Sequence, residues 1–176
     1  MPPRQDGEQK QPNPSAEHTY FFYGSLMDPL TFQGVTLAPD LPEYRDAWIE
    51  GYEVKMWGPY PALRAVSQGA SNNSNSSSSS SSNIPATPPP FSDAKQPRVV
   101  GKVWVDSSRD PDIFRRLQRY ETDSYEARIV TVHFSDGKPA PIQARAFVWA
   151  GEQSALRDGE FDLKLYQGVL GGPSSL

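Results

Sequence analysis

Cysteine is absent from the 176-residue sequence, and histidine occurs only at His18 and His133. The absence of thiols excludes disulfide bonds, thiolate catalysis and cysteine-ligated zinc sites. A Ser-His-Asp triad would have to use His133, but this residue lies in a strand-like run, where a histidine is more often a surface or packed residue. The sequence therefore favours chemistry that depends on neither a thiol nor a catalytic triad.

The short motifs of several large enzyme classes are also missing. The sequence contains no G-x-G-x-x-G, no Walker loop, no H-E-x-x-H and no G-x-S-x-G. The remaining candidate metal ligands are scattered carboxylates without the spacing of a calcium loop. We therefore expect no metal site.

Strong positive charge and long apolar runs are lacking as well. The formal net charge is -4, and the lysines and arginines are scattered apart from Arg115, Arg116 and Arg119, which are typical of the solvated face of a helix. No segment approaches the roughly 18 apolar residues of a membrane span, and the N-terminus has no signal-peptide pattern. We expect a cytoplasmic protein with neither a nucleic-acid nor a membrane partner. The sequence does not indicate an oligomeric state.

Serine and proline are concentrated in two segments that cannot form a core. Residues 1–18 are rich in proline, glutamine and charge, and we expect them to be a disordered leader. Residues 67–97 contain "SNNSNSSSSSSSN" followed by a proline-rich stretch. We expect a disordered insertion tolerated in a loop, the alternative being a phosphorylated or partner-binding segment. A single domain over residues 19–170, interrupted by this insertion, keeps about 120 residues for its fold.

The rest of the sequence contains short strand-like and helix-like runs. Strands are expected at Tyr20–Tyr23, Ala47–Trp57 with a kink at Gly51, Pro61–Val66, Val99–Val105, Arg128–Phe134 and Ala144–Trp149. Helices are expected from Pro29 to about Gly34, from Asp110-Pro111 to about Glu121, and over Phe161–Gln167. If the strands on either side of the insertion pair, the insertion is an enlarged hairpin loop. Because strands dominate and most connections are too short for βαβ crossovers, we predict an α+β fold with a small, mostly antiparallel, barrel-like sheet and a few short helices.

The stretch "YFFYGSLMDP", which begins at Tyr20, combines a buried strand with a glycine exit and a capped helix start. Backbone N–H groups from Gly24 to Asp28 approach that helix start, where they lack intrahelical partners and the helix dipole favours negative charge. This geometry suits a carboxylate or a phosphate. The alternative is purely structural, namely a strand, a glycine turn and a capped helix, and this feature alone does not exclude it.

A second candidate is Glu121, within "DPDIFRRLQRYETDSYEAR". On a helix it falls four residues after Leu117 and so joins an apolar stripe formed by Ile113, Phe114, Leu117 and Tyr120. A carboxyl held among apolar neighbours should have a raised pKa, which suits proton transfer near neutrality. The alternatives are a solvated side chain at a frayed helix end and an ion pair with an arginine.

These two features, in this order, occur where the sequence resembles the gamma-glutamylcyclotransferase-like family, especially the branch with the avirulence-induced plant proteins and their fungal relatives. The matching pieces are "FFYGSLMDP", "GYEVKMWGPYPALRAV", "VVGKVWV", "LQRYETDSYEARIVTV" and "ARAFVWAGEQSALRDGEFDLKLY". Together they span nearly all of the expected core in family order. The Y-G-S-L strand exit and the L-x-x-[YF]-E helix end followed by Y-x-x-R are more specific as a pair than either is alone. The serine-rich insertion is not a family feature.

The resemblance implies a small barrel-like α+β fold with one cavity, and it implies that Glu121 is the catalytic base. The α-carboxylate of a γ-glutamyl substrate would be held by backbone N–H groups of a turn that consists of Tyr23, Gly24, Ser25, Leu26, Met27 and Asp28. Tyr125 and Arg128 match the family's Y-x-x-R, and we expect Tyr125 to line the pocket.

The reaction implied by the resemblance is an intramolecular aminolysis by an acyltransferase-type enzyme. The α-amine of the γ-glutamyl group attacks its own γ-carbonyl, which forms 5-oxoproline and releases the attached amine without a cofactor. The nucleophile is tethered, so orientation contributes a large share of the catalysis, and a base typically adds about 10²–10⁴-fold. Two alternatives are a γ-glutamylamine-specific cyclase with the same base, and a non-catalytic small-molecule-binding or regulatory module on the same fold.

Overall fold

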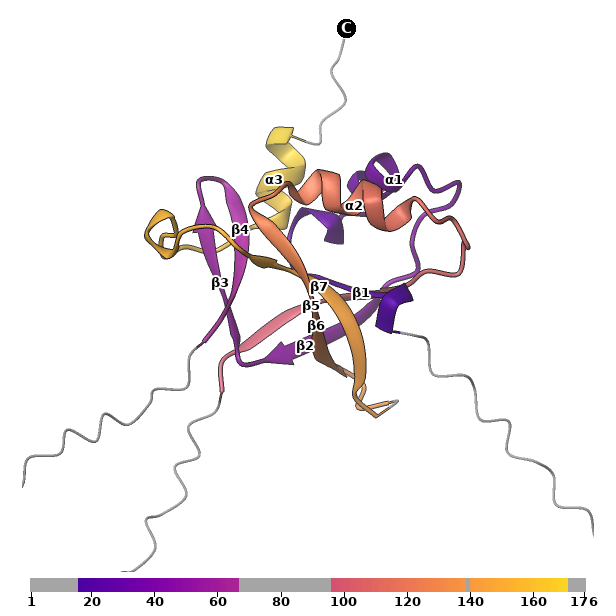
Figure 1. Ribbon diagram of the computed structural model, residues 1–176, viewed down its shortest axis with the longest axis horizontal. Helices are drawn as coiled ribbons and strands as arrows, with labels where there is room; N and C mark the ends of the chain where they lie inside the picture. Colours follow the sequence, from indigo (N-terminus) through magenta and orange to yellow (C-terminus); the bar gives the residue numbers. More distant parts are fainter. Residues whose placement is uncertain (1–15, 67–95, 139, 171–176) are drawn as a thin grey trace, which may run out of the picture.

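The computed structural model describes residues 16–66, 96–138 and 140–170, and its centre is a closed barrel of five strands (Figure 1). Around the barrel the strand order is β1-β5-β2-β6-β7, with bounds Thr19–Phe22 for β1, Arg98–Val105 for β5, Arg45–Glu50 for β2, Tyr125–Phe134 for β6 and Ile142–Trp149 for β7. Neighbouring strands are antiparallel except β1 and β7, whose parallel pairing closes the barrel. The predicted α+β class with a mostly antiparallel, barrel-like sheet is confirmed.

Strand β1 is buried on both faces, which explains the run of aromatic residues in its sequence. Phe21 belongs to the cluster inside the barrel, together with alternate residues of the other strands such as Ile49 and Val132. Tyr20 and Phe22 point the other way, because side chains alternate along a strand. They pack in a second cluster, which the helices cover and which also contains Phe32, Trp104, Ile113 and Leu117.

Two helices, α1 (Pro29–Thr36) and α2 (Ile113–Glu121), lie next to each other over one face of the barrel (Figure 1). The short 3-10 helix η2 (Ser25–Met27) connects the end of β1 to α1. Helix α2 turns its buried residues Ile113 and Leu117 towards the barrel. No helix within the described ranges combines the length and apolarity that crossing a membrane requires.

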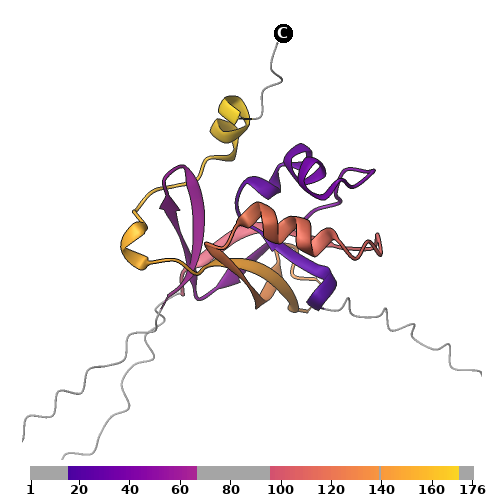
Figure 2. The ribbon, with the colours of Figure 1, turned by 45° about the horizontal axis from the view of Figure 1, so that its top comes forward.

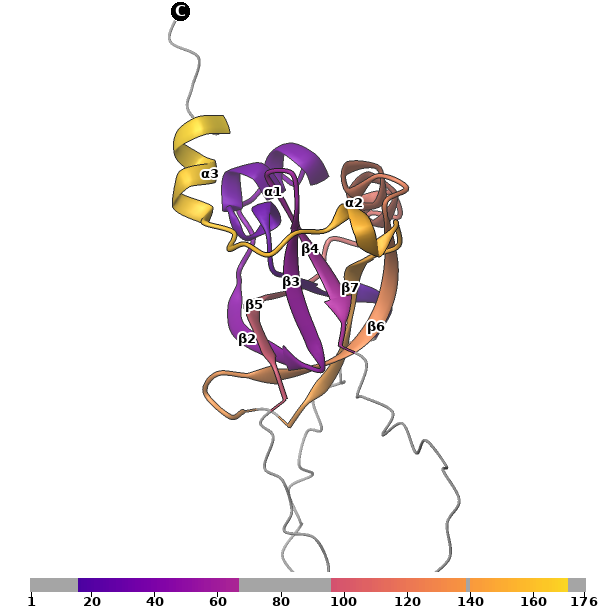
Figure 3. The ribbon, with the colours of Figure 1, turned by 90° about the vertical axis from the view of Figure 1, so that its left-hand side faces the viewer.

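A second, two-stranded sheet consists of β3 (Tyr52–Trp57) and β4 (Tyr60–Ala65), which pair as a hairpin beside the barrel (Figure 3). The predicted single strand over Ala47–Trp57 is therefore wrong. Gly51 has a φ of 78°, which favours glycine, and there the chain leaves β2 and enters the second sheet. Strand β4 pairs with β3 and β5 pairs with β1 and β2, so the connection between β4 and β5 is not a hairpin loop.

The C-terminal part of the described chain passes back over this hairpin. Arg157, just after the 3-10 helix η3 (Gln153–Ala155), forms an isolated antiparallel bridge with Met56 of β3. Helix α3 (Leu163–Leu170) follows and stands at the same end of the molecule as α1 and α2 (Figure 2). It begins two residues later than predicted, because the Asp162 carboxylate accepts the first N–H groups of the helix and caps it there.

The two segments that were predicted to be disordered lie mostly outside the described residues. Within residues 1–18, Ala16–His18 forms the 3-10 helix η1, and the His18 carbonyl accepts a hydrogen bond from the N–H of Asp106 at 2.7 Å. The predicted leader is therefore too long by these three residues. Within residues 67–97, only 96 and 97 are described.

The residues at either end of the insertion are both hydrogen-bonded to Gly51. The N–H of Val66 donates to the Gly51 carbonyl at 2.9 Å, and the N–H of Gly51 donates to the Pro97 carbonyl at 3.2 Å. This is the open end of the β3–β4 hairpin, which points away from the helices (Figure 3). The insertion therefore departs from and rejoins the fold at neighbouring points.

Replacing residues 67–95 with a short Gly-Ser linker should leave the fold intact. The two junctions are close, so a short linker spans them, and each halving of a loop changes its closure free energy by only about 0.6 kcal/mol. We expect one cooperative thermal transition by circular dichroism, with a midpoint at or slightly above that of the full chain. A midpoint lower by more than about 5 °C would mean that the replaced segment stabilises the folded state.

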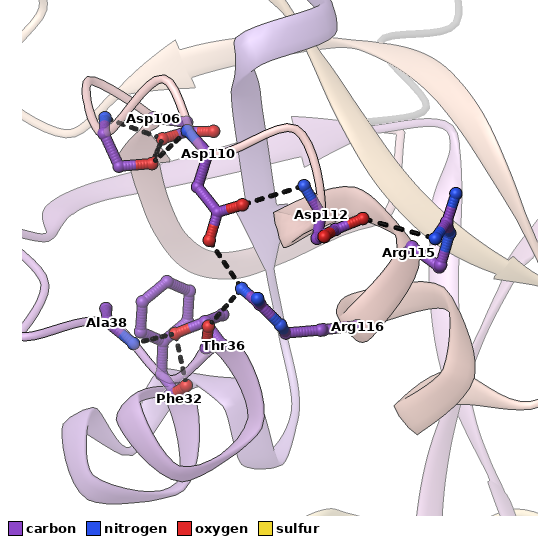
Figure 4. Close-up of polar contacts among 9 residues, drawn as sticks. Phe32, Thr36, Ala38, Asp106, Asp110, Asp112, Arg115 and Arg116 are labelled. Atoms are coloured by element: carbon purple, nitrogen blue, oxygen red, sulfur yellow. Dashed lines mark hydrogen bonds and ion pairs between the residues drawn. The ribbon is translucent and has the colours of Figure 1, made fainter.

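Helix α2 is anchored to α1 by Arg116 (Figure 4). Its guanidinium donates to the Thr36 carbonyl at 2.9 Å, at the end of α1, and to the Asp110 carboxylate at 2.6 Å. Asp110 also accepts the N–H of Asp112 at 2.9 Å, which holds a turn ahead of the helix. Helix α2 therefore starts at Ile113, two residues after the predicted start.

Arg116→Ala should lower the free energy of unfolding by about 1–3 kcal/mol, because it removes two hydrogen bonds of a charged donor. The Arg116 side chain is 28% exposed, whereas the neighbouring Arg115 is 75% exposed and pairs with Asp112 on the surface. Arg115→Ala is the matched control, and we expect it to cost less than about 0.5 kcal/mol. Urea denaturation of both variants measures the difference, and equal losses would contradict the anchoring role of Arg116.

Candidate active site

A cavity of about 460 Å³ opens where the barrel, the β3–β4 hairpin and the ends of several helices meet. Its walls come from β1 and η2, the β3–β4 turn, the end of α2, the start of β6, and single residues of β7 and α3. The lining residues are Phe21, Phe22, Tyr23, Gly24, Ser25, Leu26, Trp57, Tyr60, Pro61, Tyr120, Glu121, Thr122, Tyr125, Phe147 and Tyr166. Glu121 is the one residue in this lining that carries a formal charge.

Glu121 is the last residue of α2, four positions after the fully buried Leu117. Its side chain is half-buried at the cavity wall, and among the described residues it has no hydrogen bond or ion pair. Two of the three arginines of α2 are paired elsewhere, Arg115 with Asp112 and Arg116 with Asp110. Burial raises the pKa of Glu121 to about 7, in the direction that the sequence predicts.

Three tyrosines surround this carboxyl. Burial raises the pKa of Tyr23, Tyr120 and Tyr125, and the negative charge of Glu121 raises each further. All three phenols are therefore neutral over the physiological pH range. They give Glu121 aromatic neighbours and no opposite charge, which keeps its carboxylate form poorly stabilised.

The hydroxyl groups of Tyr23 and Tyr125 are used to build the cavity. The Tyr23 hydroxyl donates to the Phe147 carbonyl at 2.7 Å and accepts the N–H of Leu63 at 3.2 Å. The Tyr125 hydroxyl donates to the Pro61 carbonyl at 3.1 Å. The bonds to Leu63 and Pro61 tie strand β4 to the barrel, so Tyr23 and Tyr125 hold the β4 side of the cavity in position.

The turn after β1 presents backbone N–H groups on the opposite side of the cavity. In η2 the first internal bonds run from the N–H of Met27 to the Gly24 carbonyl and from the N–H of Asp28 to the Ser25 carbonyl, both at 3.0 Å. The N–H groups of Ser25 and Leu26 precede these bonds and have no acceptor inside the turn. A Cβ on Gly24 would lie 2.7 Å from the Pro61 ring, so glycine is required here by the close approach of β4.

The predicted anion cradle from Gly24 to Asp28 includes two residues that do not line the cavity. Met27 and Asp28 are not in the cavity lining, and their N–H groups are already bonded within η2. The Asp28 carboxylate caps α1 by accepting the N–H of Thr31 at 2.8 Å, and it also accepts the Gln167 amide. This cap satisfies the start of α1, so Gly24, Ser25 and Leu26 are the members of the predicted cradle that line the cavity beside Tyr23.

Several lining residues were missed by sequence reasoning. The Ser25 hydroxyl lies 2.8 Å from the Tyr120 hydroxyl, which lies 3.2 Å from the hydroxyl of Tyr166 on α3. This chain of hydroxyls joins three elements that are distant in the sequence, so no local pattern reveals it. Trp57 and Tyr60, by contrast, flank a Gly-Pro turn in a strand-rich region. Aromatic residues on both sides of such a turn could have been predicted from the sequence as candidate lining residues.

Comparison with models of protein families finds no match, and comparison with curated proteins finds none either. Solved structures that resemble this fold include two solution structures of proteins from Arabidopsis thaliana. For At5g39720.1 the TM-score is 0.52 at 20% identity, covering 86% of this chain and 81% of that one. For At3g28950.1 the TM-score is 0.54 at 19% identity, covering 88% and 74%. These two likenesses show the fold.

A structure described as a gamma-glutamyl cyclotransferase is also similar, with a TM-score of 0.48 at 12% identity, covering 76% of this chain and 66% of that one. At this TM-score the likeness adds no argument about the site. The activity therefore has to be inferred from the residues that line the cavity.

Glu121→Gln should change how stability depends on pH. The pKa of this carboxyl rises from 4.5 to about 7 on folding, so wild-type stability falls as the pH rises through that interval. Glutamine has no proton to lose. The free energy of unfolding of the variant, relative to that of wild type, should therefore increase by up to about 3 kcal/mol as the pH rises from about 4 to about 8. Denaturant unfolding across this range measures the difference. Parallel profiles would mean that Glu121 is solvated in the folded protein.

Proposed function

We propose that this protein is a gamma-glutamylcyclotransferase-type enzyme, which cyclises a γ-glutamyl group to 5-oxoproline and releases the attached amine. The observation that carries the proposal is Glu121, an unpaired carboxyl with a pKa of about 7 in a cavity whose other lining residues are uncharged. Perturbed carboxyls in cavities are typical of catalytic acids and bases. The sequence motifs shared with that family support the same assignment.

The substrate's α-carboxylate would bind at Gly24, Ser25 and Leu26. The N–H groups of Ser25 and Leu26, which have no acceptor inside the turn, suit a carboxylate. The hydroxyls of Ser25 and Tyr120 are hydrogen-bonded to each other at 2.8 Å, and the proton that this bond does not use supplies a further donor at the same wall. These donors are fixed before the substrate arrives, because η2 is closed by its own backbone bonds. Anchoring one end of the substrate in this way orients its α-amine for attack on its own γ-carbonyl.

Glu121 would act as a proton shuttle in the reaction. Its carboxylate accepts a proton from the α-amine as the nitrogen attacks the γ-carbonyl carbon and the ring C–N bond forms. The C–N bond to the leaving amine then breaks, and the leaving nitrogen takes the proton back from Glu121. No water is consumed and no electrons are transferred. A group with a pKa near 7 is suited to both halves, because it accepts and returns a proton near neutrality.

The decisive experiment is an assay of 5-oxoproline release from a panel of γ-glutamyl amino acids, γ-glutamyl amines and glutathione. We expect wild type to turn over at least one compound, and Glu121→Gln to lose at least about 100-fold in kcat/KM because the base is gone. Glu126→Gln is the matched control. Glu126 is exposed and pairs with Arg128 on the outside of β6, so this variant should keep its activity within about twofold.

Each contrary result has a distinct meaning. No turnover of any compound by wild type would favour a non-catalytic binding module on this fold. Turnover by Glu121→Gln equal to that of wild type would remove Glu121 from the mechanism. A loss in Glu126→Gln as large as that in Glu121→Gln would indicate a general effect of charge removal on this protein.

A further inference from the structure

The turn of the β3–β4 hairpin places two aromatic side chains at the mouth of the cavity. Trp57 is 37% exposed and Tyr60 is 47% exposed, although both line the cavity. We call this pair the rim residues. Their rings lie 6.3 Å apart, and Trp57 also lies 5.1 Å from Trp149 of β7, which holds it in place from behind. Large aromatic side chains that are half-exposed on a cavity wall are typical of a surface that binds an apolar group.

The rim residues continue an aromatic wall that runs inwards to Glu121. Tyr125 packs edge-on against Trp149 at 5.4 Å, and it lines the cavity together with Glu121 and Tyr60. The wall therefore leads from the carboxyl to the open side of the cavity. A substrate anchored at Gly24–Leu26 with its α-amine at Glu121 would extend its leaving group along this wall.

The wall offers no positive charge to a substrate. Within the part of the chain that the structure describes, no lysine, arginine or histidine lines the cavity. The cations on the hairpin itself are occupied, since Lys55 pairs with Asp158, and Arg64 with Glu53. A carboxylate on the leaving group would therefore have no ion-pair partner at this wall, and it would lie near the negative charge of Glu121. Desolvating an unpaired charge is unfavourable.

We propose that the rim residues Trp57 and Tyr60 form the subsite for the leaving amine. We further propose that the enzyme prefers γ-glutamyl amides of arylalkyl amines that carry no carboxylate to γ-glutamyl amino acids. This inference rests on the proposed cyclotransferase activity and adds the class of amine. The leaving amine contributes an aromatic ring to the wall. A γ-glutamyl amino acid brings a second carboxylate that the wall does not pair.

A matched set of three substrates tests the preference. γ-Glutamyl-phenethylamide and γ-glutamyl-phenylalanine share the same ring and differ by one carboxylate, and γ-glutamyl-ethylamide lacks the ring. We expect kcat/KM for the phenethylamide to exceed that for the phenylalanine compound by at least about tenfold, because of the unpaired charge. It should also exceed the value for the ethylamide, because of the lost aromatic contact.

Substitutions at the rim test the location of the subsite. Trp57→Ala should lower kcat/KM for the phenethylamide by about tenfold more than it lowers kcat/KM for the ethylamide, and circular dichroism reports whether the variant is folded. Trp48→Ala is the matched control, because Trp48 stacks on His133 at 4.1 Å and is not in the cavity lining. Trp57→Arg supplies a cation at the rim and should shift the preference towards γ-glutamyl-phenylalanine.

Different results would overturn the amine subsite and the cyclotransferase activity. Equal turnover of the three compounds, with no change in Trp57→Ala, would overturn the subsite and leave the cyclotransferase standing. Faster turnover of γ-glutamyl-phenylalanine than of the phenethylamide would also overturn the subsite. It would make Arg119, which lines a second hollow together with Thr122, the candidate partner for the extra carboxylate. No turnover of any of the three compounds would overturn both.

Discussion

The attachment of the β3–β4 hairpin to the barrel is the interaction on which the cavity depends. Tyr23 and Tyr125 bond strand β4 through Leu63 and Pro61, and Gly24 allows the Pro61 ring to approach the exit of β1. A two-stranded sheet is at best marginally stable by itself, so the hairpin takes its position from these contacts. The hairpin closes one side of the cavity and β1, η2 and α2 close the other. Loss of the attachment would open the site to water.

The same enclosure lowers the stability of the folded state. Glu121 is the one charged group in an aromatic lining, and its raised pKa means that the folded state disfavours its ionised form. A chain selected for stability alone would place an apolar residue or a paired carboxyl at this end of α2. The two clusters of buried apolar residues, inside the barrel and beneath the helices, supply the stability that offsets it. Such local destabilisation is expected at a site that works through a perturbed group.

Local pattern was enough to predict the fold class and the position of Glu121, because strand-like runs with short connections indicate the class and periodicity along one helix places the carboxyl. The four-residue spacing from Leu117 places the carboxyl on the buried stripe of α2 whatever surrounds it. The break at Gly51 was misjudged as a kink, since only tertiary pairing decides that β2 and β3 join different sheets. Asp28 caps α1, as the capped helix start in the sequence predicts, but the consequence for an anion site depends on the fold. Its cap on α1 uses the helix start that an anion would need, and its contact with Gln167 spans most of the chain.

A single carboxyl that serves two nitrogens restricts where a leaving amine can lie. In the proposed reaction Glu121 takes a proton from the α-amine and returns it to the leaving nitrogen, so both nitrogens must come within hydrogen-bond reach of one side chain. The anchor at Gly24–Leu26 fixes the glutamyl half, and the substituent on the leaving nitrogen must then extend towards Trp57 and Tyr60. In this proposal β1, η2 and α2 carry the chemistry, and the β3–β4 hairpin determines which amine is accepted. Because the hairpin is outside the closed barrel, its turn can change without disturbing barrel pairing, and substrate range can vary while the base and the anchor stay the same.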